Sequence, residues 1–524
     1  MCGIFALIFK GKFDVDKKSK YEEAFNMISH RGPDFSLLTM INGNVMLGFH
    51  RLSINDVSEN GNQPFVQDGR TTVVNGEIYN HKELKKVYNI RTESGSDCEV
   101  IGKMMDELHL MDIFPQLDGV FAGVSVRDDI VTAFRDPIGI RPLFMTENDE
   151  FIGFASEAKA LTGISSSSVD IFPIGSYWCN GEFKKYGYNN ETHNASVNFD
   201  TIKHLMIQSV EKRVKNCERG LGFFLSGGLD SSLVASIAKS LLPDQKIKTF
   251  SIGMYPNAPD LRFAAYVANK IDSEHHEVIF SKEEGIDSIR DVIYHCETYD
   301  CTTIRASVPM YLLSKYISEN TDVKVMLSGE GADELFGGYL YFHNAPSDSE
   351  FVDETERLLA EVHKFDALRA DRATAAWGLE VRVPFFDKRF NNYIRQLPGR
   401  AKMPSTTGIE KDILRSSFDE FDLMPKNVLW RQKDAFSDAV GYNWVSILKD
   451  MSEHYVSDTE FNNRKTIFSV DTPQTKEDYL YRKMYVEMFG DRQLGSNGKW
   501  LPRWVDGISD PSATYLRLHS NTKA

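Results

Sequence analysis

The feature that most constrains this chain is a change of pattern partway along it. Residues 3–186 are dominated by short β-rich runs, and beyond a polar stretch at residues 187–196 strand and helix patterns alternate. Close-set strands are typical of antiparallel sheets, whereas alternation is typical of a parallel sheet whose strands are joined through helices. The chain therefore predicts two domains of different fold class, in agreement with its length of 524 residues.

The first region predicts an α+β domain built mainly from antiparallel sheets. Apolar and β-branched residues cluster in short runs, and two helical patterns interrupt them at residues 21–29 and 97–108. The expected strands are residues 4–9, 45–54, 71–79, 121–126, 130–134 and 151–155.

The second region predicts an α/β domain with a doubly wound parallel sheet. An amphipathic helix at residues 202–214 leads to a buried strand at 221–225, and further strands at 248–252 and 323–327 alternate with helices. The C-terminal third reads as mostly helical, with residues 350–376 as its longest helix. The expected boundaries are 2–186 for the first domain, 187–199 for a linker, 200–510 for the second domain and 511–524 for a tail.

Composition and charge argue against several classes of protein. The net charge of −15 disfavours nucleic-acid binding, since such proteins concentrate Lys and Arg on one face. We expect a cytoplasmic protein, because no apolar run approaches the roughly 18 residues of a membrane span and no signal peptide is visible. The cysteines lack zinc-site spacing, so we expect reduced thiols and no structural metal. They are Cys2, Cys98, Cys179, Cys217, Cys296 and Cys301.

The loop at residues 226–232 (SGGLDSS) predicts a phosphate-binding turn. It falls between an expected strand and an expected helix, whose N-terminus offers unpaired amides and a positive dipole end to an anion. Its glycines let the backbone approach a ligand, and its serines add donors. It is not a Walker A loop, since the chain has no GxxxxGK followed by Ser or Thr. Asp230 would repel a bare phosphate, which makes it a candidate Mg²⁺ ligand; a plain strand-to-helix turn is the alternative.

Two further loops follow expected strands, at residues 251–253 with Asp260 beyond, and at 328–334 (SGEGADE). Ligands of open α/β sheets bind at the carboxyl ends of strands, where these loops would converge on residues 226–232. A nucleotide site is therefore expected. Its acidic cluster requires cations, which favours Mg²⁺ and supplies an acid or base. A solvated acidic turn is the alternative.

Cys2 directly follows the initiator methionine. Removal of Met1 would leave a thiol and a free α-amine on the same residue. A thiolate is a strong nucleophile, and an adjacent amine can act as the base that activates it. This combination suits acyl transfer, although a cysteine at this position without a function is the alternative when it is considered alone.

Three segments together resemble the motifs of glutamine-hydrolysing asparagine synthetases. They are residues 226–232, 328–339 (SGEGADELFGGY) and 368–387 (LRADRATAAWGLEVRVPFFD), and the resemblance extends over roughly residues 2–510. It implies an N-terminal-nucleophile sandwich that releases ammonia from glutamine through a thioester on Cys2. It also implies an ATP-pyrophosphatase-type domain that converts aspartate to β-aspartyl-AMP, which ammonia then converts to asparagine.

For the adenylating domain, the resemblance assigns the nucleotide site. Asp230 and Asp333 would ligate Mg²⁺, and Glu330 would assist formation of the adenylate. The residues expected to bind ATP are Phe224, Leu225, Ser226, Gly227, Gly228, Asp230, Ser231, Ile252, Asp260, Ser328 and Gly329.

Three cations are assigned by the same resemblance. Arg305 and Arg382 would bind aspartate, since guanidinium forks match carboxylates. Lys433, in the segment WRQK, would reach the transition-state phosphate. Without the resemblance, each could equally be an ordinary ion-paired cation.

For the first domain, the resemblance assigns Cys2 as the nucleophile of a class II glutamine amidotransferase. The Asn75 amide and the Gly76 N–H would form an oxyanion hole, whose donors each lower the barrier by roughly 3 kcal/mol. Arg51 would pair with the glutamine α-carboxylate, and Asp97, helped by Glu77, would accept the α-ammonium. The residues expected to bind glutamine are Arg51, Leu52, Ser53, Ile54, Asn55, Asn75, Gly76, Glu77 and Asp97.

Several alternatives stay open at this point. His30 is a second candidate base for Cys2, although we favour a histidine of a surface turn. The same fold could amidate or cyclise another carboxylate, as β-lactam synthetase-like relatives do, or serve as a non-catalytic sensor of glutamine or nucleotide. The expected partners are glutamine, aspartate and ATP, with neither nucleic acid nor membrane. A homodimer is left open.

Overall fold

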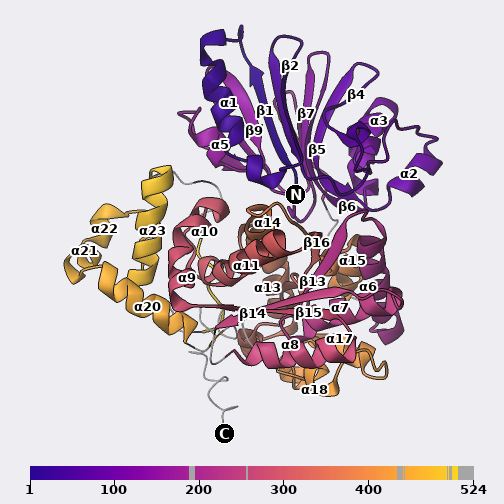
Figure 1. Ribbon diagram of the computed structural model, residues 1–524, viewed down its shortest axis with the longest axis vertical. Coiled ribbons are helices and arrows are strands. Elements are labelled where there is room, and N and C mark those ends of the chain that lie inside the picture. The colour runs from indigo at the N-terminus through magenta and orange to yellow at the C-terminus, as the bar shows by residue number, and fades with distance from the viewer. Residues whose placement is uncertain are drawn as a thin grey trace.

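The computed structural model describes residues 1–187, 195–254, 258–432, 441, 443–491, 494 and 498–505. It contains two domains, one formed by the indigo and purple part of the chain and one by the rest (Figure 1). The N-terminus lies at the junction between them. The expected tail and most of the expected linker lie outside the described residues.

The first domain consists of two antiparallel sheets of six strands each, ordered β10-β8-β9-β1-β3-β2 and β12-β11-β7-β6-β5-β4. The first sheet comprises β1 (Gly3–Phe9), β2 (Phe35–Ile41), β3 (Val45–Arg51), β8 (Phe144–Glu147), β9 (Phe151–Ala155) and β10 (Asp170–Ile171). The second comprises β4 (Phe65–Gln67), β5 (Arg70–Ile78), β6 (Gly119–Arg127), β7 (Ile130–Arg135), β11 (Ser176–Cys179) and β12 (Glu182–Lys185). The antiparallel α+β prediction is confirmed.

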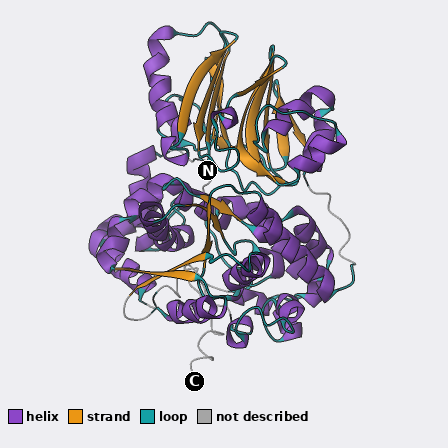
Figure 2. Ribbon diagram, turned by 45° about the vertical axis from the view of Figure 1, so that its right-hand side comes forward, coloured by secondary structure: helices purple, strands orange, loops and turns teal. Residues whose placement is uncertain are grey.

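Alternation along β1 explains how the sheets pack. Ile4 and Ala6 share a buried cluster with Val73 and Val124 of the second sheet, whereas Phe5 points to the other face, where it contacts helix α1. Helices cover the outer faces of both sheets, so the domain has four layers (Figure 2). These helices are α1 (Lys18–Asn26), α2 (His81–Val87), α3 (Glu99–Glu107), α4 (Leu110–Ile113) and α5 (Lys159–Thr162).

The second domain is built on a parallel five-stranded sheet in the order β15-β14-β13-β16-β17. The strand order reverses between β13 and β16, so the loops at their carboxyl ends diverge to opposite sides and leave a crevice. The strands are β13 (Gly220–Phe224), β14 (Lys248–Met254), β15 (Glu274–Phe280), β16 (Val323–Leu327) and β17 (Glu380–Arg382). The doubly wound prediction is confirmed.

Helices surround this sheet and form the C-terminal part. The expected single helix at residues 350–376 is wrong, because Phe365 has non-helical torsions (φ −126°, ψ −96°) that separate α13 from α14. Among the described helices, the 20-residue α11 is the longest. The helices of this domain are α6 (Phe199–Lys215), α7 (Leu229–Leu241), α8 (Pro259–Lys270), α9 (Lys282–Asp287), α10 (Ile289–Cys296), α11 (Cys301–Asn320), α12 (Ala332–Phe336), α13 (Asp348–Glu361), α14 (Asp366–Ala375), α15 (Lys388–Gln396), α16 (Pro404–Thr407), α17 (Asp412–Phe418), α18 (Lys426–Leu429), α20 (Trp444–Tyr455), α21 (Asp458–Asn462), α22 (Arg464–Ile467) and α23 (Lys476–Phe489).

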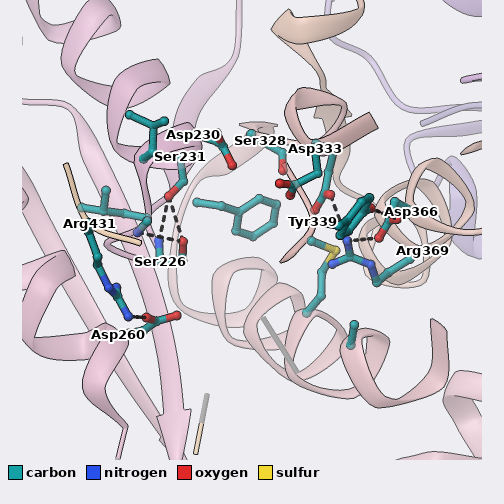
Figure 3. A pocket seen from close by; sticks show the side chains of 18 of the residues that line it. Ser226, Asp230, Ser231, Asp260, Ser328, Asp333, Tyr339, Asp366, Arg369 and Arg431 are labelled. Atoms are coloured by element: carbon teal, nitrogen blue, oxygen red, sulfur yellow. Dashed lines mark hydrogen bonds and ion pairs between the residues drawn. The ribbon is translucent and has the colours of Figure 1, made fainter. Parts of the chain in front are cut away.

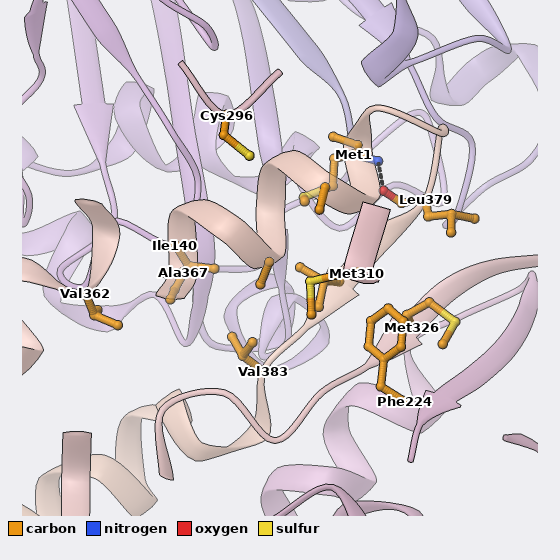
Figure 4. Close-up of a cluster of buried hydrophobic side chains, with 14 of the residues drawn as sticks. Met1, Ile140, Phe224, Cys296, Met310, Met326, Val362, Ala367, Leu379 and Val383 are labelled. Atoms are coloured by element: carbon orange, nitrogen blue, oxygen red, sulfur yellow. Dashed lines mark hydrogen bonds between the residues drawn. The ribbon is translucent and has the colours of Figure 1, made fainter. Parts of the chain in front are cut away.

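The two domains share a buried boundary. Met1 is completely buried, and its ammonium group donates to the Leu379 carbonyl at 3.3 Å, close to apolar side chains of the second domain (Figure 4). Ion pairs surround this contact, among them Arg31 with Asp371 at 2.9 Å and Arg141 with Glu380 at 3.1 Å. Within the described ranges, no helix has the length and apolar character needed to cross a membrane.

Candidate active sites

Cys2 lies beside the two groups expected to form an oxyanion hole. The Cys2 backbone N–H donates to Oδ1 of Asn75 at 3.1 Å, while Nδ2 of Asn75 is buried without a hydrogen-bond partner. An unsatisfied buried donor is costly, which indicates a place for a ligand oxygen. Gly76 has no room for a side chain, because a Cβ would lie 2.6 Å from the Val120 carbonyl.

Burial raises the pKa of the Cys2 thiol, and the neighbouring terminal ammonium opposes that effect. The thiol donates weakly to the Leu52 carbonyl at 3.8 Å. A thiol with a raised pKa requires a base to take its proton before it can attack an amide. The α-amine that Met1 removal would create on Cys2 lies on the same residue as this thiol.

A pair of carboxylates lies further along the same domain. The Nδ2 group of Asn55 donates both to Oε2 of Glu77 at 2.9 Å and to Oδ1 of Asp97 at 3.2 Å, so one amide joins the two acids. Asp97 also accepts the Ile78 N–H at 2.5 Å. Both acids are buried, with Glu77 3% and Asp97 4% exposed. Two adjacent buried carboxylates form a site that favours a cation such as an ammonium group.

Arg51 at the end of β3 is fixed by its own loop. Its guanidinium donates to Oδ1 of Asn62 at 2.7 Å and to the carbonyls of Ser58 and Asp56. These partners are neutral oxygens and leave the positive charge available for a carboxylate. The other residues expected here, Leu52, Ser53 and Ile54, are buried in the segment that follows β3.

The second site is a pocket at the carboxyl ends of β13, β14 and β16 (Figure 3). Ser226 and Ser231 lie on one side of it, and Tyr339, Asp366 and Arg369 on the other. All residues expected to bind ATP line the pocket except Gly227, and Glu330 and Asp333 line it as well.

The loop before α7 has the geometry of an anion site. The Ser226 and Ser231 hydroxyls lie 2.9 Å apart, and no side chain caps the first turn of the 13-residue helix α7. Its first amides therefore face the pocket as donors. Gly227 has a φ of +74°, and a Cβ there would lie 2.5 Å from the Ala264 nitrogen, so only glycine fits this turn.

Asp230 and Asp333 converge on one cation. The Lys411 ammonium lies 2.5 Å from Oδ2 of Asp230 and 2.6 Å from Oδ1 of Asp333. The other oxygen of Asp230 is buried without a hydrogen-bond partner. Two carboxylates close enough to share one cation, beside a phosphate-type loop, fit Mg²⁺, which in such sites takes one or two carboxylates and completes its shell with phosphate oxygens and water. In the described part of the chain, no group of three or more His, Cys, Asp or Glu residues could hold a metal by itself.

Glu330 is held by an arginine that the sequence did not single out. Arg369 Nη2 lies 2.9 Å from Glu330 and 2.6 Å from Asp366, and the Tyr339 hydroxyl oxygen lies within hydrogen-bond distance of both Asp366, at 3.0 Å, and Glu334, at 2.9 Å. Burial raises the pKa of Glu334 well above its usual range, and the nearby carboxylates of Asp366, Asp333 and Glu330 add to the effect.

The two arginines expected to bind aspartate, Arg305 and Arg382, form ion pairs outside the pocket. Neither side chain lines the pocket. Arg305 pairs with the Glu477 carboxylate through two nitrogens at 2.6 and 2.9 Å, and Arg382 pairs with Glu77 and Glu380. Their charges are already neutralised by buried carboxylates. Lys433 lies outside the described residues.

His30 does not lie on a surface turn, contrary to expectation. Its side chain is 18% exposed and packs between the domains, with Nε2 3.2 Å from Glu157 and its ring 4.6 Å from that of His295. Glu157 in turn contacts Arg372 of the second domain at 3.0 Å. His30 thus belongs to the domain boundary.

Several pocket residues were not predicted, for different reasons. Tyr339 and Arg369 lie within the quoted motifs, and Asp366 lies two residues before the third, so position in or near a motif could have indicated them. Arg431 lies within the quoted segment WRQK, whereas Lys411 had no local signal, because a lone cation looks like a surface residue. Arg431 in fact pairs with Asp260 at 2.8 Å and donates to the Gly227 carbonyl at 3.2 Å.

Comparison with known proteins covers both domains. A family model described as asparagine synthase matches residues 201–355 and 345–506, and one described as a glutamine amidotransferase domain matches residues 1–198. A protein of Rattus norvegicus named asparagine synthetase (glutamine-hydrolyzing) is 41% identical over 569 aligned positions that cover 100% of both chains. Proteins of the same name from Gallus gallus and Homo sapiens are 40% and 41% identical over 99% and 98% of each chain.

Proposed function

The chain belongs to the glutamine-hydrolysing asparagine synthetases, and we propose that the two sites described above divide its reaction between them. The enzyme makes asparagine from aspartate and ATP with nitrogen taken from glutamine. The first site would release ammonia, and the second would activate aspartate. Buried contacts join the domains that carry the two sites, which supports a coupled pair.

In the first site, Arg51 binds the glutamine α-carboxylate, and Asp97 with Glu77 binds the α-ammonium. Once Met1 has been removed, the free Cys2 amine takes the thiol proton, and the thiolate attacks the side-chain amide carbon. The oxyanion that forms is stabilised by Nδ2 of Asn75 and the N–H of Gly76. Ammonia leaves with a proton, and water hydrolyses the glutamyl thioester to glutamate and free thiol.

In the second site, the Ser226 loop and the first turn of α7 bind the ATP phosphates. The aspartate β-carboxylate attacks the α-phosphorus, so that pyrophosphate leaves and β-aspartyl-AMP forms. Ammonia then attacks the acyl carbon, and AMP leaves with one former carboxylate oxygen. Glu330 would assist formation of the adenylate, and Arg369, which lines the pocket and pairs with Glu330 at 2.9 Å, would hold that carboxylate in place.

Mg²⁺ is part of this proposal. Asp230 and Asp333 would hold it, and the ion would neutralise the charge of the pyrophosphate leaving group. A cytoplasmic location stays a prediction from the sequence, checked by cell fractionation, and the open question of a homodimer is answered by light scattering of the purified chain.

The observation that carries the proposal for the second site is the convergence of the Ser226, Asp260 and Ser328 loops on one pocket. Its test follows an oxygen atom. Aspartate labelled with ¹⁸O in its β-carboxylate should give AMP that contains one ¹⁸O when asparagine forms. Cleavage of ATP to ADP, or unlabelled AMP, would contradict adenylation of aspartate.

A further inference from the structure

All three guanidinium nitrogens of Arg382 have partners at the boundary between the domains. Its Nη2 lies 2.9 Å from Oε1 of Glu77 in the first domain, and its Nε lies 2.9 Å from Oε1 of Glu380. Its Nη1 donates to the carbonyls of Arg213 and Asn216 at 2.7 and 2.6 Å. The side chain is completely buried. A fork with four partners is fixed in one orientation.

The main chain of Arg382 contacts a loop of the ATP pocket. Arg382 pairs with Leu327 in the parallel ladder between β17 and β16, and its carbonyl accepts the Ser328 N–H at 3.0 Å. Ser328 lines the ATP pocket, whereas the Arg382 side chain does not. The side chain of Arg382 therefore reaches the first domain while its backbone supports the ATP loop.

The charge and the orientation of the Glu77 carboxylate depend on its contact with Arg382. Burial raises the pKa of Glu77 well above its usual range, the carboxylates of Asp97 and Glu380 raise it further, and the Arg382 guanidinium is the largest opposing influence. A neutral Glu77 would not attract an ammonium group. The Oε1 atom meets Arg382 and the Oε2 atom meets Asn55, so the carboxylate plane is set from both domains.

We infer that Arg382 is a positioning residue of the glutamine site, contributed by the synthetase domain, which orients Glu77 and preserves its charge for the glutamine α-ammonium. This inference rests on the proposed role of Glu77 in binding glutamine. It means that the glutaminase site is incomplete without the other domain. Glutamine recognition therefore requires the two domains to be docked, and ammonia is released only beside a formed synthetase domain.

The test uses Arg382→Gln and Arg382→Lys in the full chain. For the Gln variant, we expect the KM for glutamine in glutamate release to rise about tenfold to a hundredfold, because Glu77 loses its ion-pair partner, with kcat changed far less. The KM for aspartate in ammonia-dependent synthesis should not change, because the Ser328 contact is made by the backbone. Arg382→Lys keeps the charge and should recover most of the glutamine affinity.

The pH dependence of the KM for glutamine distinguishes a loss of charge on Glu77 from a loss of packing at the boundary. In Arg382→Gln the KM for glutamine should fall toward the native value as pH rises from about 6 to 9, because a protonated Glu77 regains its charge. In the native enzyme the Arg382 guanidinium opposes protonation of Glu77, so the same fall in KM should lie at lower pH than in the variant. The titratable and charged groups that face Glu77 are Asp97, Glu380, Arg141, Arg382, Tyr79 and Cys98.

Arg372→Gln is the matched control. Arg372 is also buried at the boundary, where it pairs with Glu157 and Glu297 at 3.0 Å, and no contact joins it to Glu77. We expect it to lower stability without raising the KM for glutamine. An equal rise in both variants would overturn the inference in favour of general loosening of the boundary.

Two further results would overturn the inference. One is a rise in the KM for aspartate with that for glutamine unchanged, which would place Arg382 in the aspartate site. The other is a native KM for glutamine in Arg382→Gln. Glu77→Gln in an otherwise native chain distinguishes a wrong role for Arg382 from a wrong role for Glu77. An unchanged KM for glutamine in this variant would refute the role of Glu77 itself.

Discussion

The ammonium nitrogen of Lys411 lies 2.5 Å from Oδ2 of Asp230, across 181 positions of sequence. Its other carboxylate partner is Asp333, and the Lys411 side chain is only 2% exposed. A buried cation between two acids compensates charges that would otherwise repel each other. Lys411 thus lies between the two carboxylates that we propose as holders of Mg²⁺, so binding of the ion by both acids would compete with the lysine for them.

Replacement of Lys411 by Met should make the free protein both less stable and more responsive to metal. Removing one partner of a buried ion pair costs about 3–5 kcal/mol, because the remaining charges stay uncompensated. We expect a lower melting temperature in EDTA and a larger rise on addition of MgCl₂ than the native protein shows. Lys426→Met, at an exposed ion pair, is the control. An equal response to MgCl₂ in all three proteins would argue against a shared cation position.

Substitutions at Asn75 should separate its donor from its acceptor. Asn75→Asp keeps an acceptor for the Cys2 backbone N–H but removes the Nδ2 donor, and Asn75→Ala removes both. Both variants should lose about 10²–10³-fold in kcat for glutamate release, since an oxyanion donor acts on the transition state. Steady-state assays with glutamine alone provide the measurement. A native kcat in Asn75→Asp would show that the amide does not stabilise an oxyanion.

Gly227→Ala should impair ATP use without affecting glutamine hydrolysis. The residue has a φ of +74°, and the added methyl would lie 2.5 Å from the Ala264 nitrogen, so the loop must move. Pyrophosphate exchange and glutamate release measure the two reactions separately. Gly228→Ala is the comparison, because its φ is −80° and the nearest atom to a Cβ lies 3.4 Å away, so a clearly smaller loss is expected. Equal losses would mean that backbone strain is not the cause.

Lys402 gives a prediction about stability and pH. Burial lowers the pKa of its ammonium from 10.5 to about 8 in the folded protein. Between these values the unfolded chain binds more protons, so the free energy of unfolding should rise as pH increases from about 8 to 10.5. At pH 7 the protonated lysine costs on the order of 3 kcal/mol.

Lys402→Met should therefore stabilise the protein at pH 7, by an amount that shrinks at high pH. The methionine removes the ammonium and keeps a flexible apolar chain near Phe351. Urea unfolding at pH 7 and about pH 10 measures the effect. A variant less stable than the native protein at both pH values would show that the contact of Lys402 with the Ile394 carbonyl outweighs its burial.

Much of the fold could be predicted because local patterns agree with it. The short apolar run of β1 and the apolar stripe of α6 each match a single structure. The break at Phe365 could not be predicted, since helical periodicity continues on both sides and tertiary contacts decide where the chain turns. Short strands such as β8 and β10 were missed for a related reason, because four or fewer residues carry too little pattern.

The site could be predicted where chemistry follows the chain locally, as in the loop at residues 226–232. The site could not be predicted where an ion pair joins residues that are far apart in the sequence. Arg382 has a carboxylate-binding side chain in a motif, and only the structure shows that Glu77 and Glu380 already occupy it. Sequence reasoning identified Asp230 and Asp333 as acids that need a cation, but it could not find Lys411 between them.

The most direct test of the two-site account is a product balance with purified protein, MgATP, aspartate and glutamine, in which asparagine, glutamate, AMP and pyrophosphate are measured together. Cys2→Ala is assayed beside it with glutamine or with ammonia. We predict that the native enzyme forms asparagine with AMP and pyrophosphate, and that the variant forms them only from ammonia. Glutamate released without asparagine or AMP, or a variant still active with glutamine, would contradict the account.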